Sequence, residues 1–508
     1  MTTIILGIDG ATFDLFEQWL PDLPTISSII DDGISAPLES CTPPVTSPAW
    51  RCYATGKDPS SLGIYWWRQL DRETNQYVGA PDVPLRSKCY WEYLSDRGLT
   101  VDVLGIPLNT PPREVNGSLV LGGPYADSED FTYPRALGET LTTRFNYHLH
   151  PTTDPASAAE PTHSNVVNEL ESIIHQRFEV AEWLREKDEP DLLNITLFYI
   201  NHLQHMSWKS EAVKQLWETI DARLGKLLEE DDNILIHSDH GLHEVQRVFY
   251  LNAWLKQHGY LKLKETQVTP METRLWNAGR RVSGKVGIQA ALSKIIPDRF
   301  KPSSSEVGGR IVDQSDFESR IDFERSIAVG LPHGLVYVLS NNEKVKRKLM
   351  DELSEIVDSK QPVFSDILSL EEVYSNPGEN SPDIFTKWNG GFEIKDISGV
   401  DPDTISGPPQ KFKADNHPQG ILLASGPDIS EEGNLNQAKL YDLAPTILHL
   451  LGHPIPDDMD GKVLSSLFSQ DSQPERNDVR TIPGQILDSS TQESTKVENR
   501  LRDLGYME

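Results

Sequence analysis

Ile4-Ile5-Leu6-Gly7-Ile8-Asp9 is a short apolar run that ends in a carboxylate. Four further apolar runs end in small or acidic residues and are separated by helical patterns. The candidate strands are 3–8, 101–106, 194–200, 233–238 and 420–424. This alternation predicts an α/β fold, in which a mostly parallel sheet is covered by helices on both faces.

Two of the helices between these strands are predicted from apolar residues at helical spacing. The first carries Val167, Leu170, Ile174, Phe178, Ala181 and Leu184, and the second carries Val213, Leu216, Ile220, Leu224 and Leu227. Both are expected to pack in the core.

Polar residues that follow the apolar runs are the candidates for a site, because ligands of open α/β sheets bind beyond the carboxyl ends of the strands. These residues are Asp9 after the first run, Asn201, His202 and His205 after the third, and Asp239 and His240 after the fourth. Oxygen and imidazole ligands suit zinc or manganese. Two such ions held close together supply what the hydrolysis of a phosphate ester needs at neutral pH.

The charge and the cysteines restrict the class of protein. The 508 residues include 47 basic and 77 acidic ones, and the formal net charge of −30 argues against a nucleic-acid polymer as the main partner. Cys41, Cys52 and Cys89 form neither an even set nor a C-x-x-C pair, so we expect no disulfide framework and a reducing, cytoplasmic location. We expect no signal peptide and no transmembrane segment.

The stretch 265–315 interrupts the strand–helix rhythm and predicts an inserted cap. The rest divides into a core, 1–264 with 316–467, and a polar tail, 468–508, expected to be loose or bound to the surface. Basic residues lie among apolar ones within 274–301. Two interpretations stay open for them, a cap helix with a solvated basic face and a lid that attracts phosphate or makes a peripheral membrane contact.

Thr46 lies in the segment Thr42-Pro43-Pro44-Val45-Thr46-Ser47-Pro48, ahead of Ala54-Thr55-Gly56. Alone, it is equally well explained as a helix N-cap. The segment nevertheless resembles the nucleophile segment of the type I phosphodiesterase/nucleotide pyrophosphatase family of the alkaline-phosphatase superfamily. In that family a threonine stands shortly before a proline and ten residues ahead of the glycine of a Thr-Gly pair, as Thr46 stands to Gly56.

The resemblance covers nearly the whole chain, because further motifs follow in the family's order. They are Gly7-Ile8-Asp9-Gly10, Ser238-Asp239-His240-Gly241, Asn416-His417-Pro418-Gln419-Gly420, Tyr441-Asp442-Leu443-Ala444-Pro445-Thr446, Asp458-Met459-Asp460-Gly461 and Arg500-Leu501-Arg502-Asp503-Leu504-Gly505-Tyr506. The resemblance implies an alkaline-phosphatase-like core and the activity of a metal-dependent phosphoester hydrolase. Its substrate would be a small-molecule phosphodiester or pyrophosphate.

The resemblance also implies two divalent metal ions, zinc or, as the alternative, manganese. One ion would be held by Asp9, Thr46, Asp239 and His240. The other would be held by His205, His417 and a residue near 201. Thr46 would be the nucleophile and would form a phosphothreonine intermediate.

Asn201 departs from the family's pattern, because many members have D-x-x-x-H where this chain has Asn201-His202-Leu203-Gln204-His205. An amide lacks the charge with which a carboxylate binds a dication. Either His202 takes its place, or the second metal binds more weakly, or activity is lost.

Other functions stay open. A phosphomonoesterase or phosphomutase of the same superfamily is one, and a non-catalytic binding protein with this fold is another. A sulfatase is disfavoured, since the segment that starts at Thr46 lacks the C/S-x-P-x-R signature. Tyr65, Trp66, Trp67 and Arg68 form either core or a platform for a base or sugar. The sequence assigns no substrate-binding residue and no oligomeric state.

Overall fold

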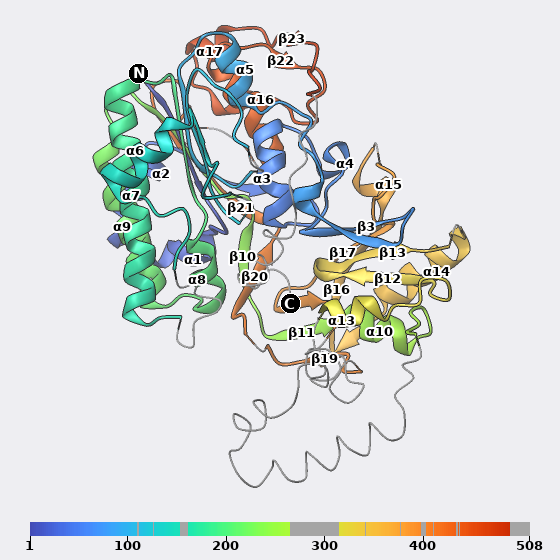
Figure 1. The fold of residues 1–508 in the computed structure, drawn as a ribbon. Coiled ribbons are helices and arrows are strands. Elements are labelled where there is room, and N and C mark those ends of the chain that lie inside the picture. Colours follow the sequence, from blue (N-terminus) through green and yellow to red (C-terminus); the bar gives the residue numbers. More distant parts are fainter. Residues whose placement is uncertain are drawn as a thin grey trace. The chain divides into compact units, whose positions relative to one another are not determined.

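The computed structural model describes residues 1–108, 111–124, 126–152, 161–264, 314–340, 342–375, 377–397, 403–409, 411–432, 435 and 437–487. The chain forms two compact units (Figure 1). The first comprises 1–246, 369–381 and 409–507, and the second comprises 247–368 and 382–408. The predicted cap and the basic stretch within it lie almost entirely outside the described residues, as do 488–508 of the predicted tail.

The first unit is built on an eight-stranded sheet with the order β2-β21-β9-β1-β8-β5-β6-β7. Its strands are β1 (Thr3–Ile8), β2 (Gly33–Glu39), β5 (Val101–Ile106), β6 (Gly117–Leu121), β7 (Thr132–Tyr133), β8 (Leu192–Leu197), β9 (Asn233–His237) and β21 (Gln419–Ser425). The five central strands, from β9 to β6, are parallel to one another. β2, β21 and β7 pair antiparallel. The predicted α/β fold with a mostly parallel sheet is therefore confirmed.

Burial explains why the central strands lack the alternation of polar and apolar residues. Every residue of β1, β5, β8 and β9 is buried, because a parallel sheet covered on both faces has no solvated face. β2 at the edge alternates between buried residues and partly or fully exposed ones.

Helices cover both faces of this sheet (Figure 1). The α-helices that the structure describes in the first unit are α1 (Phe13–Phe16), α2 (Pro24–Asp31), α3 (Thr46–Thr55), α4 (Pro59–Leu62), α5 (Tyr90–Asp96), α6 (Ala136–Phe145), α7 (Ser164–Asp188), α8 (Ile200–Met206), α9 (Glu211–Leu227), α15 (Leu370–Val373), α16 (Leu443–Leu450) and α17 (Gln473–Arg476). The two predicted amphipathic helices are α7 and α9, and all the apolar residues that predicted them are buried. No described helix combines the length and the apolar character that crossing a bilayer would need.

Three short strand pairs complete the first unit. They are β3 (Arg68–Asp71) with β4 (Gln76–Gly79), β10 (Gly241–Glu244) with β20 (Ala414–His417), and β22 (Ile455–Pro456) with β23 (Thr481–Ile482). Cys41, Cys52 and Cys89 are free and buried. Tyr65, Trp66 and Trp67 are also buried.

The second unit contains, in its described residues, three small sheets, three α-helices and a 3-10 helix at Pro332–Gly334. The first sheet has the order β18 (Phe392–Lys395), β11 (Arg247–Tyr250), β19 (Ser406–Gly407), and the second has the order β12 (Ala328–Leu331), β13 (Leu335–Val338), β17 (Ile384–Trp388), β16 (Phe364–Ser369). β14 (Val357–Asp358) pairs with β15 (Gln361–Pro362). The helices are α10 (Leu251–Gln257), α13 (Gln314–Ser319) and α14 (Glu343–Ser354).

Candidate metal centre

Three neighbouring parallel strands end at the same edge of the large sheet. β1 lies between β8 and β9, and these strands lead directly to Asp9, to α8 and to Asp239. Because parallel strands share their direction, their carboxyl ends meet and bring residues that are far apart in the sequence together. The polar residues after the predicted strands therefore gather at one edge, as the sequence indicated.

Thr46 lies at the same edge, and β2, the outermost strand on one side of the sheet, leads to it. β2 runs antiparallel to β21, which runs antiparallel to β9, so β2 and β9 share a direction. The loop after Glu39 then leads into α3, whose first residue is Thr46. Helical spacing places Trp50 one turn further along, on the same face as Thr46.

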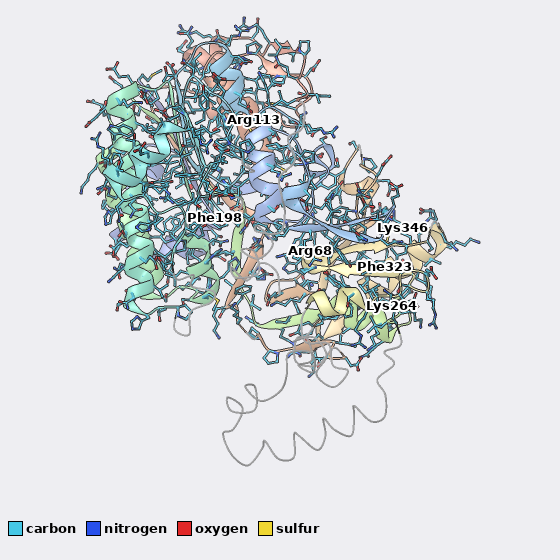
Figure 2. All side chains as sticks on the ribbon, viewed as in Figure 1. Arg68, Arg113, Phe198, Lys264, Phe323 and Lys346 are labelled. Atoms are coloured by element: carbon cyan, nitrogen blue, oxygen red, sulfur yellow. The ribbon has the colours of Figure 1, made fainter. Side chains whose placement is uncertain are left out.

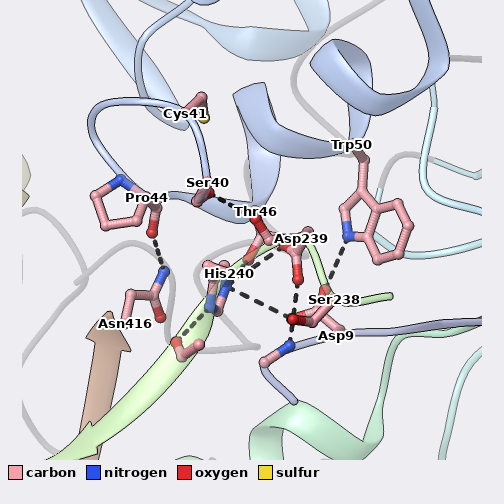
Figure 3. Close-up of polar contacts among 12 residues, drawn as sticks. Asp9, Ser40, Cys41, Pro44, Thr46, Trp50, Ser238, Asp239, His240 and Asn416 are labelled. Atoms are coloured by element: carbon pink, nitrogen blue, oxygen red, sulfur yellow. Dashed lines mark hydrogen bonds and ion pairs between the residues drawn. The ribbon is translucent and has the colours of Figure 1, made fainter. Parts of the chain in front are cut away.

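Asp9, Thr46, Asp239 and His240 converge at this edge (Figure 3). Thr46 Oγ1 lies 2.9 Å from His240 Nε2. The same nitrogen lies 3.7 Å from Asp9 Oδ1 and 3.5 Å from Asp239 Oδ2. Asp9, Asp239 and His240 are completely buried, and Thr46 is nearly so. The structure thus brings together the four residues that the resemblance assigned to the first metal.

The cluster contains two carboxyl groups, Asp9 and Asp239, and one imidazole, His240, and burial changes the pKa of all three. Burial raises the pKa of Asp239 to about 8, and burial together with the charge of Asp239 raises the pKa of Asp9 well above its usual range. Burial lowers the pKa of His240 to about 4, so its ring is neutral. The described residues therefore provide no positive charge here for the two carboxylates.

The donor atoms fit a divalent cation. Asp9 Oδ1 and Asp239 Oδ2 are buried and have no hydrogen-bond partner among the described residues, a costly state for carboxylate oxygens. Asp9, Asp239 and His240 form a group whose ligand atoms lie within 4.8 Å of one another. Two carboxylates and one imidazole are a donor set that suits zinc.

Hydrogen bonding fixes the tautomer of His240. Its Nδ1 lies 2.8 Å from the carbonyl oxygen of Gly241, which can only accept, so Nδ1 carries the proton. The lone pair of Nε2 therefore faces the cluster and accepts from the hydroxyl of Thr46. A cation bound at Nε2 would displace this hydrogen bond, because both use the same lone pair.

Trp50 was not predicted as a residue of the site. Its indole Nε1 donates to Asp9 Oδ2 at 3.0 Å. The indole fits because β1 carries Gly7 beneath it, where a Cβ atom would come within 2.7 Å of Trp50 Cη2. The signal was present in the sequence, since Trp50 follows Thr46 by one helical turn.

The loop between β2 and α3 is tied down by side chains from distant parts of the unit. Ser40 Oγ donates to the carbonyl oxygen of Asp239 at 2.6 Å. Asn416 Nδ2 donates to the carbonyl oxygen of Pro44 at 2.8 Å (Figure 3), and the amide of Thr42 donates to Tyr374 Oη at 3.1 Å. Thr46 is therefore held by contacts on both sides of the loop.

The motif Asp458-Met459-Asp460-Gly461 contacts the C-terminal end of α3. The carbonyl oxygen of Gly56, which follows the helix, accepts from the amides of Asp460 at 2.9 Å and Gly461 at 3.0 Å. Lys57 Nζ lies 2.5 Å from Asp458 Oδ2. This late motif therefore supports the C-terminal end of α3.

α8 carries Asn201, His202 and His205 of the residues predicted for the second metal, and β20 carries His417. Asn201 and His205 are one turn apart and share a face. His205 Nδ1 lies 2.7 Å from the carbonyl oxygen of Ala414, and burial lowers the pKa of His205 to about 4. The ring of His202 packs edge-on against Phe198 (labelled in Figure 2) and Tyr199, with ring centroids 5.6 and 5.7 Å away.

His417 lies at the end of β20, opposite Gly241 of β10. Its Nδ1 accepts from the amide of Gln419 at 3.2 Å, and its ring centroid lies 5.7 Å from that of His243. Burial, with the nearby His243, lowers the pKa of His417. Within the described part of the chain, His202, His205 and His417 do not form a group of three as tight as the first cluster.

One family model matches most of this chain. The family model described as type I phosphodiesterase/nucleotide pyrophosphatase matches residues 3–346. A search of curated proteins found no match to the sequence.

Several solved structures share the fold. Phosphonoacetate hydrolase from Sinorhizobium meliloti, in complex with phosphonoformate, matches with a TM-score of 0.57 and 14% identity, over 87% of this chain and 94% of its own. Human ectonucleotide pyrophosphatase/phosphodiesterase 5 matches with a TM-score of 0.53 and 14% identity, over 92% and 100%. An inactive variant of the murine counterpart, in complex with AMP, matches with a TM-score of 0.51 and 13% identity, over 92% and 100%.

Proposed function

Because this chain belongs to the type I phosphodiesterase/nucleotide pyrophosphatase family of the alkaline-phosphatase superfamily, we propose that it is a metal-dependent hydrolase of small phosphodiesters or pyrophosphates with Thr46 as its nucleophile. The observation that carries the proposal is the convergence of Thr46 with Asp9, Asp239 and His240 in one buried cluster. Members of this family typically bind two metal ions, and AMP in the murine relative's complex supports a nucleotide-like substrate.

Zinc or manganese ions, when bound, would lower the pKa of the Thr46 hydroxyl and neutralise charge on the phosphoryl group. Asp9, Asp239 and His240 would hold the first ion together with the Thr46 oxygen. The N-terminal turn of α3 and the tied loop before it keep that oxygen in place, which lowers the entropic cost of attack.

The reaction has two displacements at phosphorus. In the first, the Thr46 oxygen, having lost its proton, forms a bond to phosphorus while the bond to the leaving-group oxygen breaks, and that oxygen is released as an alcohol or phosphate. In the second, a water oxygen bonds to phosphorus and the bond to Thr46 breaks. Two inversions retain the configuration overall, and the hydroxyl of Thr46 is restored.

Acid quenching of the enzyme during turnover of a radiolabelled diester tests the proposal. We expect label on Thr46 in the wild-type protein and none in Thr46→Ala. Thr46→Ser, which keeps a hydroxyl, should retain labelling and part of the activity. Turnover by Thr46→Ala at the wild-type rate would refute the role of Thr46.

A metal-exchange experiment tests the cofactor. Chelation should abolish the hydrolysis of bis-p-nitrophenyl phosphate, and Zn²⁺ or Mn²⁺ should restore it. Bound metal without turnover on any diester, pyrophosphate or monoester would favour the non-catalytic alternative. A higher kcat/KM for monoesters than for diesters would favour a phosphomonoesterase.

A further inference from the structure

The second ion of the proposed hydrolase lacks a charged ligand at the position where the family pattern has one. Asn201 is completely buried, and neither its Oδ1 nor its Nδ2 has a hydrogen-bond partner among the described residues. Its amide lies against Gly10, so closely that a Cβ atom there would come within 2.2 Å of Asn201 Oδ1. An amide oxygen can bind a dication, but it provides no negative charge.

Asp415 is a buried carboxylate that the proposed function does not use, and its charge acts on the ring of His205. Among the described residues, the ligand atoms of Asp415, His205 and His417 do not all lie within 4.8 Å of one another, as those of the first cluster do. Asp415 lies in β20, its side chain is only 4% exposed, and its Oδ2 has no hydrogen-bond partner in the described part of the chain. Burying a carboxylate oxygen without a partner is costly, so this atom indicates that a cation or a proton is missing.

The strand places Asp415 on the side of the metal residues. Successive side chains of a strand point to opposite faces, so Asp415 and His417 share one face of β20. Asn416 between them points to the other face, where it donates to the carbonyl oxygen of Pro44.

α8 is joined to the start of β20 by two hydrogen bonds. The amide of Lys413 donates to the carbonyl oxygen of His205 at 2.7 Å, and His205 Nδ1 donates to the carbonyl oxygen of Ala414 at 2.7 Å. The proton of the neutral ring is therefore on Nδ1, and the lone pair of Nε2 is available to a metal. A backbone carbonyl that orients a histidine in this way is common around metal ligands.

We propose that Asp415 supplies the carboxylate of the second metal site, together with His205 and His417, in place of the carboxylate that is absent at position 201. The inference rests on the proposed function. One carboxylate and two imidazoles form a donor set known from zinc enzymes. In addition, the charge of Asp415 acts on the rings of both His205 and His240, where it opposes the lowering of their pKa by burial.

Zinc stoichiometry tests the inference without using activity. Purified full-length protein is stripped with a chelator and dialysed against buffered Zn²⁺, and bound zinc is measured by mass spectrometry. We expect two equivalents for the wild type and one for Asp415→Asn, with the Kd of the second ion weakened roughly tenfold or more. The double variant Asn201→Asp/Asp415→Asn should recover the second equivalent, which a general folding defect would not allow.

Glu244→Gln is the matched control, because Glu244 lies on β10, the strand paired with β20, and is exposed. It should bind two equivalents. Two equivalents in Asp415→Asn with unchanged affinity, or one equivalent in both that variant and the wild type, would overturn the inference. A wild type that binds two ions but hydrolyses no phosphoester would instead refute the proposed function alone.

Discussion

Trp50 shows how one residue outside the ligand set can tune the cluster. Its hydrogen bond to Asp9 opposes the rise in the pKa of Asp9 that burial causes. Trp50→Phe removes the donor but keeps most of the ring, so ionised Asp9 becomes less stable. We expect the affinity for Zn²⁺ to fall roughly tenfold, the lower end for such supporting contacts.

Competition with a chromogenic chelator measures that affinity. Trp183→Phe is the control, because Trp183 lies on α7 beside Phe145 and makes no hydrogen bond to a cluster residue that the structure describes. Equal affinities in Trp50→Phe and the wild type would show that this bond does not support Asp9.

Asp102 is a second buried carboxylate, in β5 and outside the cluster. Burial, with the nearby Asp188, raises its pKa to about 7, whereas the unfolded chain has a pKa of about 3.9. The native state therefore binds this proton more tightly, and stability is lost as the pH rises from about 4 to about 7. Asp102→Asn, which cannot ionise, should be more stable than the wild type at pH 8 by roughly 2–4 kcal/mol.

Urea denaturation at a series of pH values measures this difference, which should shrink as the pH falls from 7 to 5. Asp71→Asn is the control: hydrogen bonds from Thr74 lower the pKa of this half-buried residue, so its removal should give no gain at pH 8. A gain for Asp102→Asn that stays the same at every pH would contradict the explanation.

The close approach of the end of β1 to α8 depends on Gly10. Gly10 has φ +68°, and Gly63 has φ +66° with nothing within 4 Å of where its Cβ would lie. Alanine at either position adopts the left-handed region at a cost of about 1 kcal/mol. Gly10→Ala should lose about 1–3 kcal/mol more, because its Cβ would collide with Asn201.

Chemical denaturation measures the free energy of unfolding of Gly10→Ala and Gly63→Ala. Because both variants have the same backbone cost, the difference between their losses of stability gives the cost of the collision with Asn201. Gly10→Ala should also bind Zn²⁺ more weakly, because the amide of Gly10 donates to Asp239 Oδ1 at 3.2 Å. Equal losses of stability would mean that α8 moves away from β1 without cost.

The sequence predicted the central strands well and their ends less well. The predicted strands 3–8 and 101–106 coincide with β1 and β5. The strand predicted at 194–200 ends at Leu197, and α8 begins at Ile200. Phe198, Tyr199 and Ile200 continue the apolar run, and an apolar run alone does not separate the end of a strand from the start of a buried helix.

The direction of β21 and the existence of β2 were not predicted. The run 420–424 resembles the parallel strands in composition, yet β21 is antiparallel to both its neighbours. Its partner β2 contains Pro37 and Gly33 and has only alternate residues buried, so it gives no continuous apolar run. Strand direction depends on where the chain returns to the sheet, which local composition does not encode.

Some residues of the candidate site were also predictable from the sequence, and others were not. Asp9, Asp239 and His240 follow apolar strands directly, so their place at the edge was predictable from the sequence. Trp50 and Asp415 were missed, because their importance depends on which atoms lie opposite them. Their roles depend on the packing of α3 and β20 against elements distant in sequence.

The charge of the whole molecule predicts an unusual salt dependence. A net charge of −30 repels an anionic phosphoester, and this repulsion is screened as the Debye length falls from about 30 Å at 0.01 M salt to about 8 Å at 0.15 M. The kcat/KM for bis-p-nitrophenyl phosphate should therefore rise roughly twofold or more over this range. Steady-state kinetics at several KCl concentrations measure it.

p-Nitrophenyl phosphorylcholine is the control substrate, because its positive and negative charges cancel and screening should leave its kcat/KM unchanged. If kcat/KM for the anionic diester fell with salt instead, the entrance to the site would have a positive local potential despite the overall charge.

The position of β21 between β2 and β9 has a consequence for biosynthesis. β2 leads into the loop that holds Thr46, yet its neighbour in the sheet is made nearly 400 residues later. Once the ribosome has passed the middle of the gene, Asp9, Thr46, Asp239 and His240 have all been made, but the strand that pairs with both β2 and β9 has not. The nascent polypeptide thus completes the sheet beside this cluster only when β21, a late segment, pairs with β2 and β9.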